Sequence, residues 1–258
     1  MIPKTIHYCW FGETPLPEQY RKYMESWQRY CPDYKIIEWN ESNFDTTRNR
    51  YCQEAYSAQK WAFVSDYARL KIIYECGGVY LDTDVELVKD ITPLVVDGIG
   101  FIGFQNPIEA TTGLGFAAAP HNEVVKAMLD IYENRTFVLS DGTYNLIPCP
   151  AANTTGLISC GLKIDYPWCN RIQTLQGIAV YPEEYFNPLN YDTQKLNVTS
   201  NTYMIHHYSA TWINNNRKIR KIAKQFLPSF LLQSHTKRVS KRDLQLIKEE
   251  LLKGNTKG

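Results

Sequence analysis

The chain has 258 residues, a formal net charge of +1, 44% hydrophobic residues and 13% aromatic residues, which suits a globular protein of one large domain or two small ones. A near-neutral chain gives no electrostatic reason to expect nucleic acid as a partner, and no stretch approaches the roughly 20 apolar residues of a membrane span. The seven scattered cysteines, without a CxxC pair, argue against a disulfide scaffold or a zinc site, so we expect a cytoplasmic location.

The first part of the chain alternates strand and helix patterns. We expect strands at Thr5–Trp10 and Tyr34–Trp39, with a helix at Glu18–Tyr30 between them. Apolar residues recur at helical spacing over Ala55–Cys76. Gly77-Gly78 follows them, and glycine is the residue favoured just after the C-terminus of a helix. The spacing therefore predicts one long helix that ends at the glycines.

A short apolar strand, Val79–Leu81, is expected next, and it runs into Asp82-Thr83-Asp84. A further strand at Gly100–Phe104 and a helix at Asn122–Glu133 continue the alternation. This order predicts an α/β fold with a mostly parallel sheet and flanking helices, in which ligands sit beyond the carboxyl ends of the strands. Asp82 would lie at such an end.

The second part is less regular. Residues Asp141–Asn190 show no clean period and are expected to form loops and short strands that cover the site. The apolar run Tyr203–Ile205 is typical of a last strand, and Ser240–Lys253 is expected to form a final helix with Ser240 as its N-cap. We expect a main domain at 1–215 and a helical tail at 216–258.

Asp82 and Asp84 are candidates for a metal site. If the strand extends through both, their side chains project to the same face, close enough to share a cation. Carboxylate oxygens suit Mn²⁺ or Mg²⁺, and a diphosphate can supply further ligands. Most Asp-x-Asp pairs are solvated turn acids, but this pair follows a helix, two glycines and an apolar strand. Taken alone, Asp66 and Arg69, three apart on the predicted helix, indicate an intrahelical ion pair, but together with the downstream motif they become candidate site residues.

Four blocks of the sequence together resemble one known family, over roughly residues 1–215. The blocks are Ile6–Gly12, Ser65–Arg69, Gly77–Asp84 and His206–Trp212. They occur in the order seen in glycosyltransferase family 32, which includes bacterial capsular-polysaccharide transferases and yeast initiation mannosyltransferases and is related to the glucosylating domains of clostridial toxins. The resemblance implies a GT-A fold, a Rossmann-like sheet with the metal-binding aspartates at its edge, and retention of anomeric configuration.

The resemblance also implies roles for individual residues. The implied nucleotide-sugar-binding set is Trp10, Ser65, Asp66, Arg69, Tyr80, Asp82, Thr211 and Trp212. Trp10 would stack on the base, Asp66 and Arg69 would hold the donor sugar and phosphate, and Asp82 with Asp84 would anchor the metal. Without the resemblance, core filling is an equally good interpretation of Trp10, because it is the more common fate of a strand aromatic, but the resemblance favours stacking. Thr211 stands where the family usually has Ser, which preserves the hydroxyl.

His206 and His207 follow the last predicted strand. Adjacent strand residues point in opposite directions, so only one of this pair can face the site. We expect His206 to be the third metal ligand beside Asp82 and Asp84, and His207 to serve packing or a hydrogen bond.

These features predict a metal-dependent retaining glycosyltransferase with Asp66, Arg69, Asp82 and Asp84 at its catalytic centre. We expect it to move a hexose, galactose first, from a UDP-sugar donor to a glycan or lipid-linked oligosaccharide acceptor in capsular or surface polysaccharide synthesis. The alternatives are a GDP-mannose-dependent mannosyltransferase and a catalytically silent nucleotide-sugar-binding module. A nucleotide hydrolase is disfavoured because no Gly-x-x-x-x-Gly-Lys-Ser/Thr loop is present.

The tail is rich in basic and apolar residues, and no acid occurs between Thr193 and Arg242. Such a mixture suits peripheral association with an anionic bilayer, here the cytoplasmic face of the inner membrane. The alternative is a helix packed on the main domain with a solvated basic face.

Overall fold

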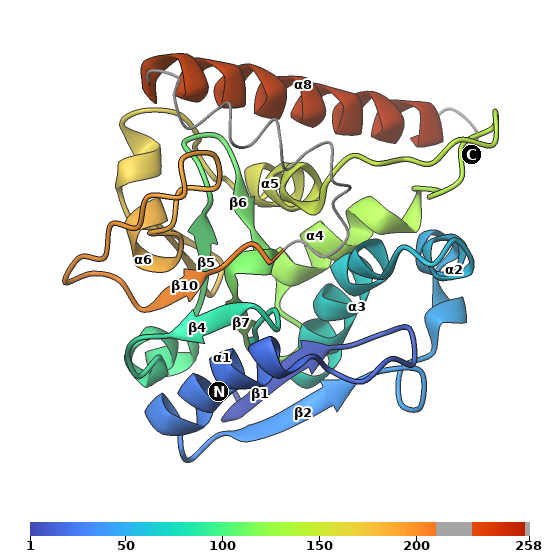
Figure 1. Ribbon diagram of the computed structural model, residues 1–258. Coiled ribbons are helices and arrows are strands. Elements are labelled where there is room, and N and C mark those ends of the chain that lie inside the picture. The colour runs from blue at the N-terminus through green and yellow to red at the C-terminus, as the bar shows by residue number, and fades with distance from the viewer. Residues whose placement is uncertain (210–228, 256–258) are drawn as a thin grey trace.

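The computed structural model describes residues 1–209 and 229–255 and is built around a mixed sheet of eight strands (Figure 1). The strand order is β2-β1-β3-β7-β5-β9-β8, with β6 pairing on β5. Strands β2, β1, β3, β5 and β9 run in one direction and the others run against them, which confirms the predicted α/β fold with a mostly parallel sheet. The strands are β1 (Thr5–Cys9), β2 (Lys35–Trp39), β3 (Gly78–Tyr80), β5 (Gly100–Phe104), β6 (Ala110–Thr111), β7 (Phe116–Ala118), β8 (Gln173–Leu175) and β9 (Ile178–Tyr181).

Helices cover both faces of the sheet (Figure 1). One face carries α1 and a small second sheet made of β4 (Val85–Leu87) and β10 (Met204–His206), and the other carries α2 to α5. Side chains alternate between the two faces along each strand, so Val79 and Phe101 face α1 while Tyr80 and Ile102 face α3. The helices are α1 (Glu18–Tyr30), α2 (Arg50–Ser57), α3 (Trp61–Cys76), α4 (Glu123–Glu133), α5 (Cys149–Ser159), α6 (Glu183–Phe186) and α8 (Ser229–Asn255), with short 3₁₀ helices at Thr46–Arg48, Thr92–Gly98, Thr112–Leu114 and Trp168–Asn170.

The long helix predicted over Ala55–Cys76 is wrong at its start, because α2 and α3 are separate helices. Gln59 between them has a φ of 54°, which lies in the left-handed region and breaks the helical path. The predicted end is confirmed. Gly77 has a φ of 64°, and a Cβ there would lie 2.5 Å from Pro120 Cδ, so the chain needs glycine to turn from α3 into β3.

The expectation of loops and short strands over Asp141–Asn190 missed helix α5. This helix shows no polar face because every residue from Pro150 to Leu157 is buried. It packs against α4 on one side and α8 on the other (Figure 1). A helix covered all round carries no amphipathic period in its sequence.

The final helix begins well before its predicted start. Ser240 is not an N-cap but a buried residue inside α8, and its Oγ donates a 2.6 Å hydrogen bond to Glu109 Oε2. Leu244 and Ile247 of α8 belong to the same apolar core as α3, α4 and α5. At the other end Arg135 Nε donates to Glu250 Oε2 at 2.8 Å. Within the described ranges, no helix is both long and apolar enough to cross a membrane.

The packing of α8 predicts very different effects for two neighbouring residues. Ile247 is fully buried whereas Leu246 is 38% exposed. Ile247→Ala should lower the free energy of unfolding by about 2–5 kcal/mol, because it leaves a cavity between α8 and the core. Leu246→Ala should cost less than about 1 kcal/mol. Urea unfolding of both variants checks this, and equal effects would contradict the docking of α8.

Candidate functional site

The two aspartates of the Asp-x-Asp motif lie in a turn between β3 and β4. Strand β3 ends at Tyr80, and the backbone N–H of Val85 donates to the carbonyl of Asp82 at 3.0 Å. The sequence argument assumed that the strand extends through Asp82 and Asp84, but it ends before both residues. A tight turn brings the two carboxylates together instead.

Arg69 is the cation at the centre of this site and is only 4% exposed. Its Nη2 donates to Asp66 Oδ1 at 2.7 Å, and its Nη1 lies 3.4 Å from Asp82 Oδ2. The guanidinium lies over the ring of Tyr80, whose hydroxyl donates to Asp82 Oδ1 at 2.9 Å. The Nε group donates to the carbonyl of Ser65 at 3.0 Å, which fixes the side chain along α3. The helix ion pair predicted from sequence is thus one part of a network that reaches Asp82.

Burial raises the pKa of both Asp66 and Asp82, although the nearby Arg69 charge opposes the rise. Burial alone would lower the pKa of Arg69, but the adjacent Asp82 and the other acidic groups outweigh it and raise that pKa. Arg69 therefore stays charged. The single guanidinium of Arg69 faces two acids, Asp66 and Asp82, and a third acid, Asp84, lies close by. The excess of acidic groups means that the site attracts further positive charge.

Strand β10 supplies that further group. Its antiparallel register on β4 sets His206 opposite Val85, the residue after Asp84. His206 Nε2 lies 3.1 Å from Asp84 Oδ1, while its Nδ1 is buried with no hydrogen-bond partner among the described atoms. One ligand atom from each of Asp82, Asp84 and His206 lies within 4.8 Å of the other two. Two carboxylates and an imidazole are ligands that Mn²⁺ accepts, so these residues fit the predicted metal site.

His207 turns away from this cluster. Its Nε2 lies 2.8 Å from Glu86 Oε2, and its ring stacks on Tyr23 with a centroid separation of 4.2 Å. The strand alternation therefore places His206, and not His207, at the two aspartates. That His206 acts as a ligand stays a prediction.

Asp84 and His206 shift each other's pKa. Burial alone would raise the pKa of Asp84, but His206 and the backbone N–H of Ser209, which donates to Oδ2 at 2.9 Å, lower it to about 2. Burial alone would lower the pKa of His206, but Asp84 outweighs it and raises that pKa above its usual value. Both shifts favour an ion pair when no other cation is bound.

The remaining predicted residues are less closely tied to the cluster. Trp10 follows β1, donates from Nε1 to the carbonyl of Thr14 at 2.6 Å and contacts the ring of Tyr20 at 5.6 Å. Its ring is partly exposed, so stacking on a base stays a prediction. Thr211 and Trp212 lie outside the described residues.

One neighbour of the network was missed from the sequence. A Cβ added to Gly113 would lie 3.2 Å from both Arg69 Nη1 and Asp82 Oδ2. Asn153 of α5 holds this turn, because its Oδ1 accepts from the backbone N–H and the hydroxyl of Thr112 at 3.1 and 3.0 Å. A lone glycine in an irregular segment carries no motif, so only the tertiary structure reveals it.

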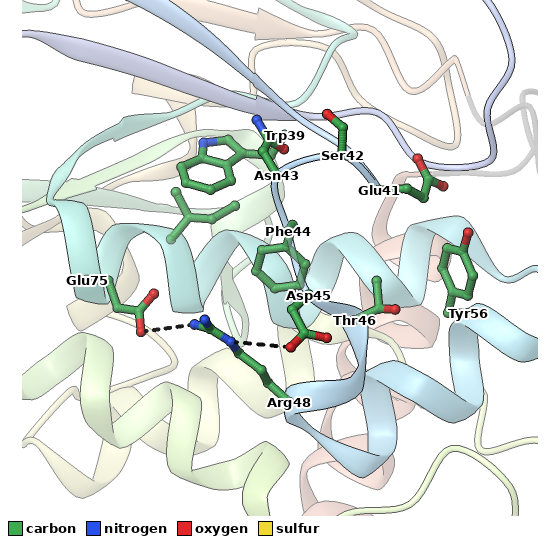
Figure 2. A pocket seen from close by; sticks show the side chains of 11 residues that line it. Trp39, Glu41, Ser42, Asn43, Phe44, Asp45, Thr46, Arg48, Tyr56 and Glu75 are labelled. Carbon is green, nitrogen blue, oxygen red and sulfur yellow. Dashed lines mark ion pairs between the residues drawn. The ribbon is translucent and has the colours of Figure 1, made fainter.

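A hollow of about 560 Å³ lies apart from the cluster, at the loop after β2 (Figure 2). Arg48 is one of its lining residues and forms ion pairs of 3.7 Å with both Asp45 and Glu75. Trp39 and Phe44 supply part of its apolar wall. None of the predicted site residues lines it.

Residues 17–101 match the family described as the glycosyltransferase sugar-binding region containing a DXD motif. The matched range includes α3, β3 and both aspartates. This region is similar to DXD glycosyltransferases. The predicted resemblance to glycosyltransferase family 32 is thereby confirmed, and the DXD region contains the whole Arg69 network while His206 lies beyond it.

Two curated relatives are similar to part of the chain. The chain is 29% identical over 130 residues to inositol phosphoceramide mannosyltransferase 1 of Schizosaccharomyces pombe, covering 46% of this chain and 39% of that protein. It is 31% identical over 107 residues to the glycosyltransferase L373 of Acanthamoeba polyphaga mimivirus, covering 39% and 42%. The chain therefore spans less than half the length of either relative.

Two solved glycosyltransferases are similar to the chain in structure. The PaToxG glycosyltransferase has a TM-score of 0.49 at 19% identity, covering 61% of this chain and 69% of that one. A glycosyltransferase involved in glycosylation of the major capsid of PBCV-1 has a TM-score of 0.42 at 13% identity, covering 86% of this chain and all of that one.

The raised pKa of His206 predicts a pH-dependent contribution to stability in metal-free protein. A folded-state pKa above the unfolded value means that protonated His206 stabilises the fold at low pH, and that this contribution disappears as pH rises through the folded pKa. His206→Gln should therefore destabilise the protein more at pH 6 than at pH 9. Urea unfolding in the presence of a chelator measures this, with His235→Gln, at an exposed position of α8, as the control. Equal destabilisation by His206→Gln at both pH values would contradict the ion pair.

Proposed function

We propose that the chain is a metal-dependent glycosyltransferase that moves a hexose from a nucleotide sugar to a saccharide acceptor. The observation that carries this proposal is that Asp82 and Asp84 of the DXD region meet both the Arg69 network and His206. A silent binding module would have no need to keep this complete set of charged groups.

The reaction must stabilise the diphosphate that leaves the anomeric carbon as an anion. A Mn²⁺ or Mg²⁺ ion held by Asp82, Asp84 and His206 would supply positive charge there when bound. Arg69 adds a fixed cation whose direction is set by Asp66 and by the Ser65 carbonyl, so it needs no reorganisation during transfer. Asp66 holds Arg69 in place. In this proposal it also accepts a hydrogen bond from a hydroxyl of the donor sugar.

Retention of anomeric configuration is part of the proposal. Each acid of the cluster is already engaged: Asp66 with Arg69, Asp82 with Arg69 and Tyr80, and Asp84 with His206. These partners lower the nucleophilicity of the carboxylates, which supports front-face attack by the acceptor hydroxyl with the departing phosphate as its base. No covalent glycosyl-enzyme is then needed.

Two donor classes compete. The sequence resemblance favours a UDP-hexose, galactose first, whereas the first relative is named a mannosyltransferase, which favours GDP-mannose as the second candidate. Incubation with Mn²⁺ and a panel of UDP- and GDP-sugars, with and without acceptor glycans, separates these classes by the nucleoside diphosphate released.

The acceptor class, a glycan or lipid-linked oligosaccharide of capsule or surface-polysaccharide assembly, and a cytoplasmic location complete the proposal. Attachment of the C-terminal tail to an anionic membrane stays a prediction. Five basic residues of the tail, between Arg217 and Lys224, lie outside the described residues. Two others, Lys237 and Lys241, pair with Asp165 of the main domain. Flotation with anionic liposomes would test the attachment.

Removal of either aspartate charge should abolish transfer. Asp82→Asn and Asp84→Asn should each lower metal-dependent release of nucleoside diphosphate by about 100-fold or more, because the leaving anion loses its stabilising charge. Asp33→Asn is the matched control, since Asp33 is exposed and precedes the start of β2, whereas Asp82 follows the end of β3, which runs in the same direction. Turnover of either variant within a few fold of the wild type would refute the proposed function.

The two histidines should differ in metal binding. His206→Ala should weaken Mn²⁺ activation by about tenfold or more, and binding of the nucleotide with it, because protein and diphosphate hold the ion jointly. His207→Ala should mainly lower stability, since it removes the contacts with Glu86 and Tyr23. Titration of Mn²⁺ activation for both variants measures this. A loss of metal affinity confined to His207→Ala would reverse the assignment.

A further inference from the structure

A second cavity, of about 570 Å³, lies beside helix α6 and has no role in the site described so far. Its volume falls within the range of roughly 300–1,000 Å³ that small-molecule sites occupy. The walls come from α6, from the 3₁₀ helix ending at Asn170 and from the loop that follows α6. They consist of Asn170, Pro182, Glu183, Glu184, Asn187, Pro188, Asn190, Lys195 and Asn197.

One side chain connects this cavity to the metal cluster. The Tyr208 hydroxyl donates to Asn187 Oδ1 at 2.8 Å, and the Tyr208 ring meets the His206 ring edge-on with centroids 4.2 Å apart. The side chain of Tyr208 therefore contacts both a wall residue of the cavity and His206, which lies beside Asp84. Figure 1 shows α6 on the opposite side of β4 and β10 from α3, which carries Arg69.

The polar groups of the cavity suit a neutral ligand with many hydroxyls. Amide side chains both donate and accept hydrogen bonds, and carboxylates accept them from hydroxyls. Asn197 and Lys195 have no side-chain hydrogen bond within the described residues, and Asn190 uses its Oδ1 for turn contacts while its Nδ2 has no such partner. Two acids against one lysine disfavour phosphate and other anions. The two proline rings are too small an apolar surface to hold a lipid chain.

Glu183 is the least explained group in this wall. Its Oε1 accepts a long bond of 3.3 Å from Asn187 Nδ2, and no cation pairs with it among the residues that the structure describes. Burial raises the pKa of Glu183 to about 7, although the Asn187 bond opposes the rise. Burying part of a carboxyl group without a cation partner costs free energy, and hydroxyl groups of a ligand would offset this cost by donating hydrogen bonds to it.

We infer that this cavity binds the acceptor saccharide of the proposed transfer. The inference rests on the proposed function, which places the donor on the Arg69 side of the cluster and needs a second sugar on another side. Glu183 and Asn197 bind hydroxyls of the acceptor, and Asn187 fixes the acceptor relative to Tyr208 and His206. The cavity has room for a sugar of one or two rings, so it selects the terminal residues of the acceptor glycan.

The test measures saccharide binding and nucleotide binding separately. Saturation-transfer NMR without donor probes methyl glycosides of mannose, galactose and glucose, together with lactose and maltose, and calorimetry measures UDP and GDP binding with Mn²⁺. Glu183→Gln and Asn197→Ala are the cavity variants, and Asn197 is exposed in a loop, so its variant should fold normally. Glu133→Gln, at an exposed position of α4, is the control for loss of one acid.

The wild type and the control should bind at least one of these saccharides. Both cavity variants should lose at least fivefold in that affinity, while their nucleotide affinity stays within twofold of the wild type. The inference is overturned if a wild-type protein that binds nucleotide binds none of the saccharides, or if both cavity variants bind them as the wild type does. Failure of the wild type to bind either nucleotide would instead refute the proposed function, and the acceptor assignment with it.

Discussion

Charge balance around the buried guanidinium of Arg69 is the constraint on which the rest of the site depends. An unpaired buried charge is very costly, so Arg69 requires Asp66 on its own helix and Asp82 from the turn after β3. The pairing links α3 to the turn after β3 and fixes the position of the Asp82 carboxylate. It also explains why Gly113 must lack a side chain, since a methyl group there would press on both charged partners.

Much of this arrangement could be predicted from residues close together in sequence. The first two strands, the helices α1 and α4 and the glycine end of α3 follow from local propensity and from spacing. The opposite orientations of His206 and His207 follow from strand geometry alone. Each of these features is decided within a few residues, so a single sequence contains the information.

Other features depend on contacts that local patterns do not record. The break at Gln59 is a single residue with positive φ, and α5 lacks a polar face because neighbours cover all of it. Ser240 looks like a cap in sequence, yet its hydroxyl bonds Glu109 from the middle of α8. The link from Tyr208 to Asn187, and with it the cavity beside α6, joins segments whose own sequences suggest only loops. Tertiary packing decides all four.

The antiparallel pairing of β10 with β4 has a consequence for how the protein is made. The ribosome releases Asp82 and Asp84 long before it has synthesised the strand that carries His206, so the nascent chain displays the motif without its imidazole neighbour. Only the late addition of one short strand to β4 closes that gap. A cation held by all three residues would join early and late segments of the chain, and because all three ligands meet only in the folded protein, its binding free energy would stabilise the fold.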